Sequence, residues 1–417
     1  MRKNKFLALL LLAGWVGMTT SCSNESVLTA DGDDMDVAAA LGAKLVFSIA
    51  TPSAGNIVMR DTQTDDETAI KSVNVYLFAL SDDATASTAT DSDYKLLSTT
   101  AFTSDGEETF TDDGSGTVEC AIDINDEWSE KTIRALIVAN DTRTDEFTVG
   151  TSTIANLTGA LASATVSDGD HADVLVGNPD DSSATGFPMA AEASYTDGTE
   201  TTSYVTLGSE TVELSASLVR TVARVDIRNS YDGLTVDYVY ISDVANQSYL
   251  FAQSSQAAPS GASYISLYPM TTYCDSDDNS IYTSWSFTSS SSEEETTTDG
   301  TDSSSTESDD TADEYEAHEG EFYLYEQESS STYCPTVYIT FSTSAGYGKV
   351  NVPFQSSNSY VNVERNHRYI IVLGGEEEET GTVTASLFDA SDWDTEDDDV
   401  ITVSVTKTTT SSSETTE

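Results

Sequence analysis

The sequence is poor in the residue types on which many enzymes and nucleic-acid-binding proteins depend. It has three histidines, four cysteines and only 17 basic residues against 72 acidic ones, which gives a formal net charge of −55. A field of that sign repels phosphate backbones and anionic lipid surfaces. We therefore expect no nucleic-acid partner and no attachment to a membrane through surface charge.

Motifs for catalysis and for metal binding are also lacking. His171, His318 and His367 lie in unrelated contexts without the spacing of a zinc site, and there is no nucleophile elbow, phosphate loop or dinucleotide fingerprint. The acidic stretch 275–279 comes nearest to a calcium loop, but it lacks the turn glycine and the closing glutamate of an EF-hand. We expect a protein that is not an enzyme, with no cofactor and no metal.

Long apolar runs are absent except at the N-terminus. Phe6 to Met18 follows the basic residues of positions 2–5, and Thr19 to Ser21 lead into Cys22. The run is too short to span a bilayer as a stable helix, and the pattern resembles a bacterial lipoprotein signal that is cleaved before a lipidated Cys22. A plain secretory signal is the alternative. Both predict export, and membrane attachment would depend on the lipid on Cys22 alone.

The cysteines beyond Cys22 have separate contexts. Cys120 lies in the strand-like segment 117–122, where a buried free thiol would behave as a small apolar side chain. Cys274 and Cys334 bracket a long acidic stretch, and a disulfide between them could close its base in an oxidising compartment. Whether they pair depends on a Cα separation that the sequence does not give, so both states stay open.

Apolar residues alternate with period two along most of the chain, which predicts an all-β protein. Leu45, Phe47 and Ile49 share one face of an early segment, and Val73, Val75 and Leu77 share one face of residues 71–80. Residues 131–140 are apolar on both faces, as in a central strand. Residues 218–227 read as one long half-buried strand, and Arg220, Arg224 and Arg228 predict ion pairs with neighbouring strands.

The length and local composition predict two domains. A polar stretch at 197–206 suggests the boundary between them. Residues 288–314 are almost wholly Ser, Thr, Asp, Glu and Gly and are predicted to form a disordered surface insert, and the C-terminal tail has the same character.

The order of the β segments resembles that of a known family. Residues 70–78 (IKSVNVYLF), 137–140 (IVAN), 187–189 (FPM) and 218–225 (LVRTVARV) are followed by 322–326 (FYLYE), 336–339 (TVYI), 352–354 (VPF), 365–369 (RNHRY) and Trp393. Together with the lipoprotein signal, this order resembles the Bacteroidetes fimbrillins, the FimA and Mfa-like major fimbrial subunits of type V pili. The resemblance covers roughly residues 40 to 405 and departs from the family in the insert 288–314 and at Tyr325.

The resemblance implies two tandem transthyretin-like β-sandwich domains and a pattern of processing. The implied parts are a signal peptide (1–21), a lipidated pro-segment that is removed (22–60), an N-terminal domain (61–203), a C-terminal domain with the acidic insert (204–405) and a flexible tail (406–417). A trypsin-like maturation protease would cut after Arg60, so that the mature chain begins at Asp61. Lys44 and Lys71 are the other candidate sites.

The resemblance also implies assembly by donor-strand exchange. Removal of the pro-segment would take out the strand that carries Leu45, Phe47 and Ile49 and would leave an apolar groove with unpaired backbone groups. The alternating segment 400–405 carries Ile401, Val403 and Val405 and could fill the groove of a neighbouring subunit. Such a head-to-tail contact does not close and produces a filament.

The expected product is a subunit of a cell-surface fimbrium that supports adhesion. It would be an outer-membrane lipoprotein precursor first and extracellular afterwards, with identical or related subunits as partners and a host or bacterial surface receptor as a further one. The alternatives are a tip or accessory adhesin, and a surface lipoprotein that binds a glycan or host protein without polymerising. An ordinary edge strand at 400–405 and an ordinary loop arginine at Arg60 also remain open.

Overall fold

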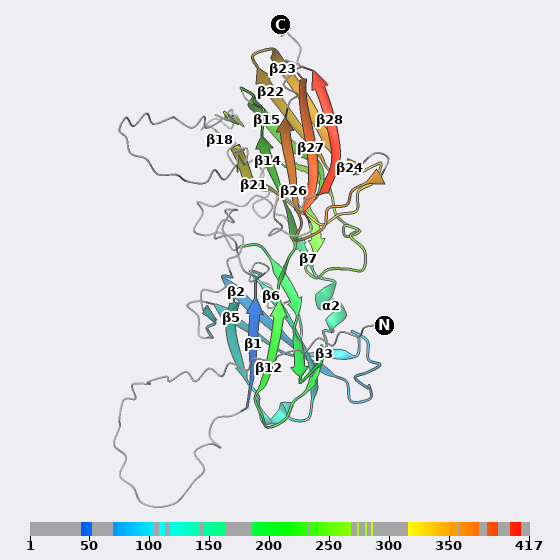
Figure 1. Cartoon of the computed structure of the whole chain (residues 1–417). Coiled ribbons are helices and arrows are strands. Elements are labelled where there is room, and N and C mark those ends of the chain that lie inside the picture. The colour runs from blue at the N-terminus through cyan, green and yellow to red at the C-terminus, as the bar shows by residue number, and fades with distance from the viewer. Residues whose placement is uncertain are drawn as a thin grey trace, which may run out of the picture. The chain divides into compact units, whose positions relative to one another are not determined.

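The alternating segments form β-strands in a computed structural model of the chain (Figure 1). The structure describes residues 43–51, 70–103, 108–112, 117–141, 146–163, 186–231, 233–267, 273–274, 280–281, 285–286, 316–356, 359–374, 382–390 and 401–409. Within these ranges helical structure is limited to α2 (Ile154–Thr158) and the 3-10 turn η2 (Asp126–Trp128). The predicted all-β class is confirmed. In the same ranges no helix is long and apolar enough to cross a membrane.

Two sheets form the first sandwich. Their strands are β1 (Lys44–Ala50), β2 (Ser72–Leu80), β3 (Tyr94–Thr103), β4 (Thr111–Asp112), β5 (Thr117–Asp123), β6 (Thr132–Ala139), β8 (Met189–Glu192), β9 (Ser194–Asp197), β10 (Glu200–Thr202), β11 (Val205–Thr206), β12 (Val212–Ser217) and β13 (Val219–Arg220). One sheet has the order β10-β9-β12-β1-β5-β4, and the other has the order β13-β8-β6-β2-β3 with β11 beside β6. Side chains from both sheets share one apolar core.

The facing predicted for the early strands is confirmed. Val73, Val75 and Leu77 of β2 lie in the core between the two sheets. Tyr76 and Phe78 point to the other face of the same strand, where they join a second apolar cluster. Alternate residues of a strand point to opposite faces, so a strand that is apolar on both must be covered on both.

The second sandwich is built from the later strands. They are β14 (Val222–Asn229), β15 (Thr235–Ala245), β17 (Tyr264–Leu267), β20 (Trp285–Ser286), β21 (Glu316–Tyr325), β22 (Thr336–Thr343), β23 (Gly346–Pro353), β26 (Arg368–Gly374), β27 (Thr382–Ala390) and β28 (Ile401–Thr409). One sheet has the order β21-β14-β26-β27-β28, and the other has the order β17-β15-β22-β23 with β20 beside β15. Short pairs complete the list: β7 (Leu161–Ser163) with β16 (Gln247–Tyr249), β18 (Tyr273–Cys274) with β19 (Ser280–Ile281), and β24 (Gln355–Ser356) with β25 (Ser359–Tyr360).

The change from one set of sheets to the other comes later than the polar stretch at 197–206. β11 and β12 follow the expected boundary at 203, yet β11 pairs with β6 and β12 pairs with β1. The domain bounds given above stay a prediction, because strand pairing does not show which parts of the chain fold independently.

The single strand expected over residues 218–227 is instead two strands. β13 ends at Arg220 and pairs with β8, whereas β14 begins at Val222 and pairs with β21 and β26. Between them the Thr221 amide donates to the Pro188 carbonyl at 3.1 Å. The chain changes partners at this residue, which alternation alone cannot reveal because the apolar period continues across the break.

Ion pairs form around a buried carboxylate, although Arg224 forms its pair within its own strand. Asp226 accepts from Arg224 Nε of that strand at 2.7 Å and from Arg368 Nε of the neighbouring strand β26 at 2.8 Å. The pairing of the predicted arginines with neighbouring strands therefore stays a prediction. Arg220 Nη1 donates to Asn366 Oδ1 at 2.9 Å. Buried charges are tolerated when they are paired and hydrogen-bonded, and these arginines are structural.

Candidate functional site

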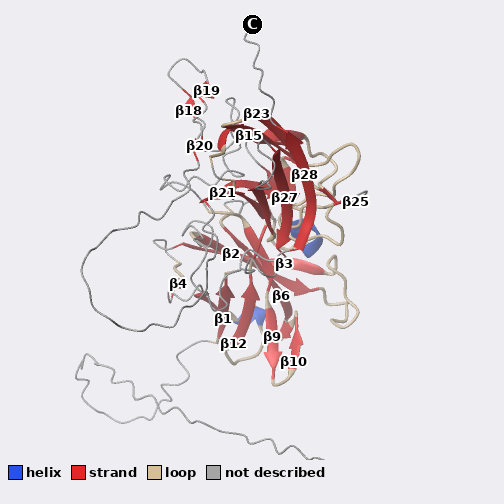
Figure 2. Ribbon diagram, turned by 45° about the horizontal axis from the view of Figure 1, so that its top comes forward, coloured by secondary structure: helices blue, strands red, loops and turns tan. Residues whose placement is uncertain are grey.

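Strand β1 lies in the middle of its sheet, between β12 and β5 (Figure 1), and Figure 2 shows it beside β12. It runs parallel to β12 and antiparallel to β5. The pairing continues past the strand ends, where the Ile124 amide donates to the Ala43 carbonyl at 2.8 Å and the Leu218 amide donates to the Ala50 carbonyl at 2.9 Å. Loss of β1 would leave two strands with unpaired backbone groups facing one gap.

The three predicted residues of β1 form the inner face of this strand. Leu45, Phe47 and Ile49 each have 0% of their surface exposed. Each has an apolar neighbour on either side in register: Val212, Leu214 and Ala216 on β12, and Ile122, Cys120 and Val118 on β5. The gap that β1 fills is therefore an apolar slot with three successive side-chain positions.

Strand β1 is joined to the following strand by a segment that contains the predicted cleavage site. β2 belongs to the other sheet, and Arg60 and Asp61 fall between β1 and β2. Residues 52–69 lie outside the described residues, as does Cys22. A single cut in this connection would leave β1 attached to the fold only by hydrogen bonds and apolar contacts. The identity of the cut site stays a prediction.

Cys120 lies opposite Phe47 in the slot. It is a buried free thiol, as the sequence predicted, and burial raises its pKa to about 12. A thiol is a poor nucleophile until it loses its proton, so this cysteine is inert while β1 covers it. Its reactivity can therefore report whether the slot is occupied.

Strand β28 contains the predicted donor residues and lies at the end of its sheet (Figure 1). Its only partner in the described sheet order is β27, and the strand extends past the expected end at Val405 to Thr409. Val405 is 56% exposed, while the side chains of Ile401 and Val403 lie outside the described parts. A strand with one partner can leave its sheet at lower cost than a central strand can.

The alternation of β28 is interrupted within its own sheet. The register shifts between Leu387 and Phe388 of β27, opposite Ser404 and Thr402 of β28. A bulge of this kind leaves one residue without a partner and disturbs the ladder, which weakens the edge pairing. The donor assignment itself stays a prediction.

Whether Cys274 and Cys334 pair stays open. Cys334 has a free thiol, and its Sγ lies 3.6 Å from the Phe354 carbonyl oxygen and 3.7 Å from that of Pro335. The side chain of Cys274 lies outside the described residues. Within the short strand β18, the backbone of Cys274 pairs with Ser280.

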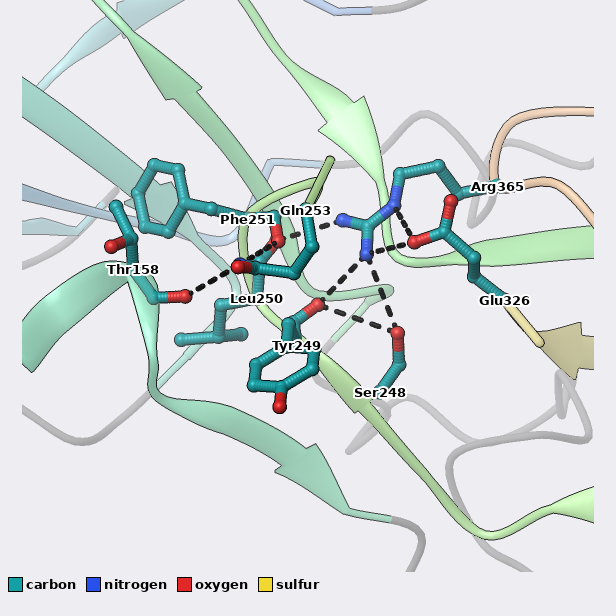
Figure 3. Close-up of polar contacts among 8 residues, drawn as sticks. All are labelled: Thr158, Ser248, Tyr249, Leu250, Phe251, Gln253, Glu326 and Arg365. Atoms are coloured by element: carbon teal, nitrogen blue, oxygen red, sulfur yellow. Dashed lines mark hydrogen bonds and ion pairs between the residues drawn. The ribbon is translucent and has the colours of Figure 1, made fainter. Parts of the chain in front are cut away.

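The structure brings together one polar cluster that sequence reasoning missed (Figure 3). The Arg365 guanidinium contacts the Glu326 carboxylate at 2.6 Å and also donates to the Tyr249 and Leu250 carbonyls at 3.1 and 3.0 Å. Its Nη2 lies 3.4 Å from the Ser248 hydroxyl. The ion pair is nearly covered, with side-chain exposures of 6% for Arg365 and 12% for Glu326.

This cluster holds the segment 247–250, which pairs with residues 160–163. Residues 247–249 form β16, which pairs with β7, and the Leu250 amide donates to the Ala160 carbonyl at 2.9 Å. Gln253 Nε2 donates to the Thr158 carbonyl at the end of α2, also at 2.9 Å (Figure 3). The sequence shows only alternating apolar residues around these positions, and no local pattern marks Arg365 and Glu326 as a pair.

One histidine contacts two carboxylates in the part of the chain that the structure describes. His367 lies between Asp389, at 3.1 Å from Nδ1, and Glu364, at 3.4 Å from Nε2. His318 lies on β21, and His171 lies outside the described residues. No group of three His, Cys, Asp or Glu side chains suited to a metal occurs among the residues that the structure describes.

Comparison with known proteins gives matches among solved structures only. The sequence matches no protein-family model and no curated protein. The chain is similar to the tip fimbrial protein Mfa3 from Porphyromonas gingivalis with C-terminal truncation, at a TM-score of 0.45 and 12% identity over 84% of this chain and 99% of that one. It is also similar to the fimbrial anchor protein Mfa2 from the same organism, at a TM-score of 0.35 and 11% identity over 88% and 97% of the two chains.

Proposed function

We propose that this protein is a structural subunit of a cell-surface fimbrium that assembles by donor-strand exchange and supports adhesion. A lipidated precursor is cut in the connection between β1 and β2, β1 leaves, and a C-terminal strand of another subunit takes its place. The partners are identical or related subunits and a trypsin-like protease. The observation that carries the proposal is the slot of β1, a central position lined on both sides by apolar residues in register.

The covalent connectivity supports this proposal. β1 is the first strand of the described chain, so a cut between residues 51 and 70 separates it from everything that follows without dividing another described strand. Three fully buried side chains would leave with it, each worth roughly 1.5–3 kcal/mol of burial. A slot emptied at that cost is stabilised by any strand that restores the burial and the backbone pairing.

The position of β28 supports the same proposal from the donor side. It is the last of the described strands, has one partner strand in the described sheet, and has an exposed valine. If β28 left, its sheet would lose only the edge strand, and β21, β14, β26 and β27 would stay paired. In the slot of another subunit it would gain two partner strands in place of one.

The test uses the exported chain with a site for a specific protease placed in residues 52–69. After cleavage we expect polymers that survive as ladders on a denaturing gel without boiling, with the β1 fragment absent from them. Val403→Asp places a charge in the slot and should abolish the ladders. Thr402→Asp, on the alternate face of the inserted strand, is the matched control and should keep them.

Two results would contradict the proposal. Ladders that persist in Val403→Asp would show that β28 is not the donor. Release of the β1 fragment at high protein concentration with only monomers left would favour a surface lipoprotein that does not polymerise. N-terminal sequencing of protein released from cells tests the natural site, because the prediction is a start at Asp61.

A further inference from the structure

The slot of β1 has one position that is larger than the other two. Phe47 occupies the middle position, between Leu45 and Ile49, with no exposed surface. Its side chain lies in the same core cluster as residues of both sheets. Protein cores are packed closely, so a smaller residue at this position leaves a void and loses contacts.

The register in which β28 can fill this slot is restricted by its own sequence. If Ile401, Val403 and Val405 enter the three positions, Val403 takes the middle one in either strand direction. A shift by two residues would bring Asp399 or Lys407 into an apolar position. A shift by one would bring in Thr402 and Ser404 with their neighbours. Buried charges and unpaired hydroxyls are costly, so the first register is the best available.

The chain's own donor therefore places a valine where β1 has a phenylalanine. Strand β27, which precedes β28, does not supply a larger residue for the middle position. Its residues Val383, Ala385 and Leu387 share one face and would place an alanine there. The other face of β27 would bring Thr384 and Ser386 with Phe388. Neither C-terminal strand offers an aromatic side chain flanked by two aliphatic ones.

We infer that the middle position of the β1 slot selects the donor, and that the preferred donor is a strand of a different subunit with an aromatic residue between two aliphatic ones at alternate positions. This inference rests on the proposed function. Insertion of β28 from another copy of this chain would then be weaker than insertion of the different subunit's strand. The protein would accept a partner subunit in preference to its own copy.

A displacement experiment tests this inference on the folded chain. The chain with the inserted protease site is folded, cut between β1 and β2, and mixed with peptides of residues 401–409. Displacement of the β1 fragment is followed by mass, and labelling of Cys120 by a thiol reagent reports whether the slot is open. The peptides are the native sequence, Val403→Phe, and the matched controls Ile401→Phe and Val405→Phe, with a peptide of residues 44–50 as the reference.

We expect the Val403→Phe peptide to displace the fragment at a concentration at least about tenfold lower than the native peptide, equivalent to about 1.4 kcal/mol. The two controls should not improve on the native peptide, since their positions hold Leu45 and Ile49. Equal activity of the native and Val403→Phe peptides would overturn the inference and leave the proposed function intact. Failure of every peptide, including 44–50, to enter the slot would overturn both.

Discussion

Replacement of Arg365 by methionine should destabilise the fold strongly. Methionine keeps much of the apolar bulk of the stem and removes the guanidinium. The change deletes the two contacts to Glu326 Oε2, at 2.6 and 2.9 Å, and the donors to the Tyr249 and Leu250 carbonyls. The Glu326 carboxylate, 12% exposed, would then be left without its counter-charge.

The expected size follows from this geometry. Breaking a buried ion pair by removing one partner costs about 3–5 kcal/mol, because the remaining charge is uncompensated. Glu326→Gln should cost less, since the guanidinium keeps its two carbonyl partners. The double variant Arg365→Met, Glu326→Gln removes both charges and should recover part of the loss. The two single changes should therefore be non-additive by about 1–3 kcal/mol.

The assay is chemical denaturation of the four proteins, with the midpoint and slope fitted for each. Hydrogen exchange of the Leu250 amide, which donates to Ala160, should become faster in Arg365→Met because the segment behind it loses its anchor. A loss below about 1 kcal/mol, or a double variant as unstable as the sum of the single ones, would refute the reasoning. Unchanged exchange at Leu250 would refute the proposed link between the ion pair and the β16–β7 contact.

Two further predictions follow from close packing and from burial. Gly348→Ala should destabilise the second sandwich by about 1–3 kcal/mol, because a Cβ there would overlap the ring of Phe341. Gly208→Ala, with nothing within 4 Å, is the control in the same denaturation assay, and equal effects would contradict the packing argument. Burial raises the pKa of the Cys120 thiol to about 12, so above about pH 8.5 the unfolded chain loses a proton that the folded chain keeps. Stability should therefore fall from about pH 8.5 towards 12, and less steeply in Cys120→Ala; identical pH slopes would contradict this assignment.

Much of the fold could be predicted because burial leaves a periodic trace in the sequence. Leu45, Phe47 and Ile49 lie at alternate positions of one short segment, and the structure buries all three. Residues 131–140 are apolar on both faces, and β6 lies inside the first sandwich with core on both sides. Local alternation is enough to identify such strands, because each strand needs only its own residues to show which faces are covered.

The pairing of strands could not be predicted in the same way. Residues 212–217 alternate clearly, but nothing in that segment shows that it runs parallel to β1 from beyond the expected boundary. The break at Thr221 and the bulge opposite Leu387 are likewise set by partners distant in sequence. The Arg365 and Glu326 pair joins residues 39 positions apart, and its carbonyl partners lie more than 100 positions away. Contacts of that range have no local signature.

One measurement tests directly whether β28 takes the place of β1. In a Cys274→Ser, Cys334→Ser background, Val403→Cys places a thiol at the middle donor position, opposite Cys120 of the receiving subunit if the slot is filled as proposed. Residues directly opposite one another on paired strands lie within disulfide range if the donor runs antiparallel to β5, as β1 does. Cleavage between β1 and β2 under oxidising conditions should then give covalent ladders that reductant dissolves. The ladders should be absent without cleavage and absent in Cys120→Ala. Cleaved protein that remains uncrosslinked, or crosslinks that persist in Cys120→Ala, would contradict the account.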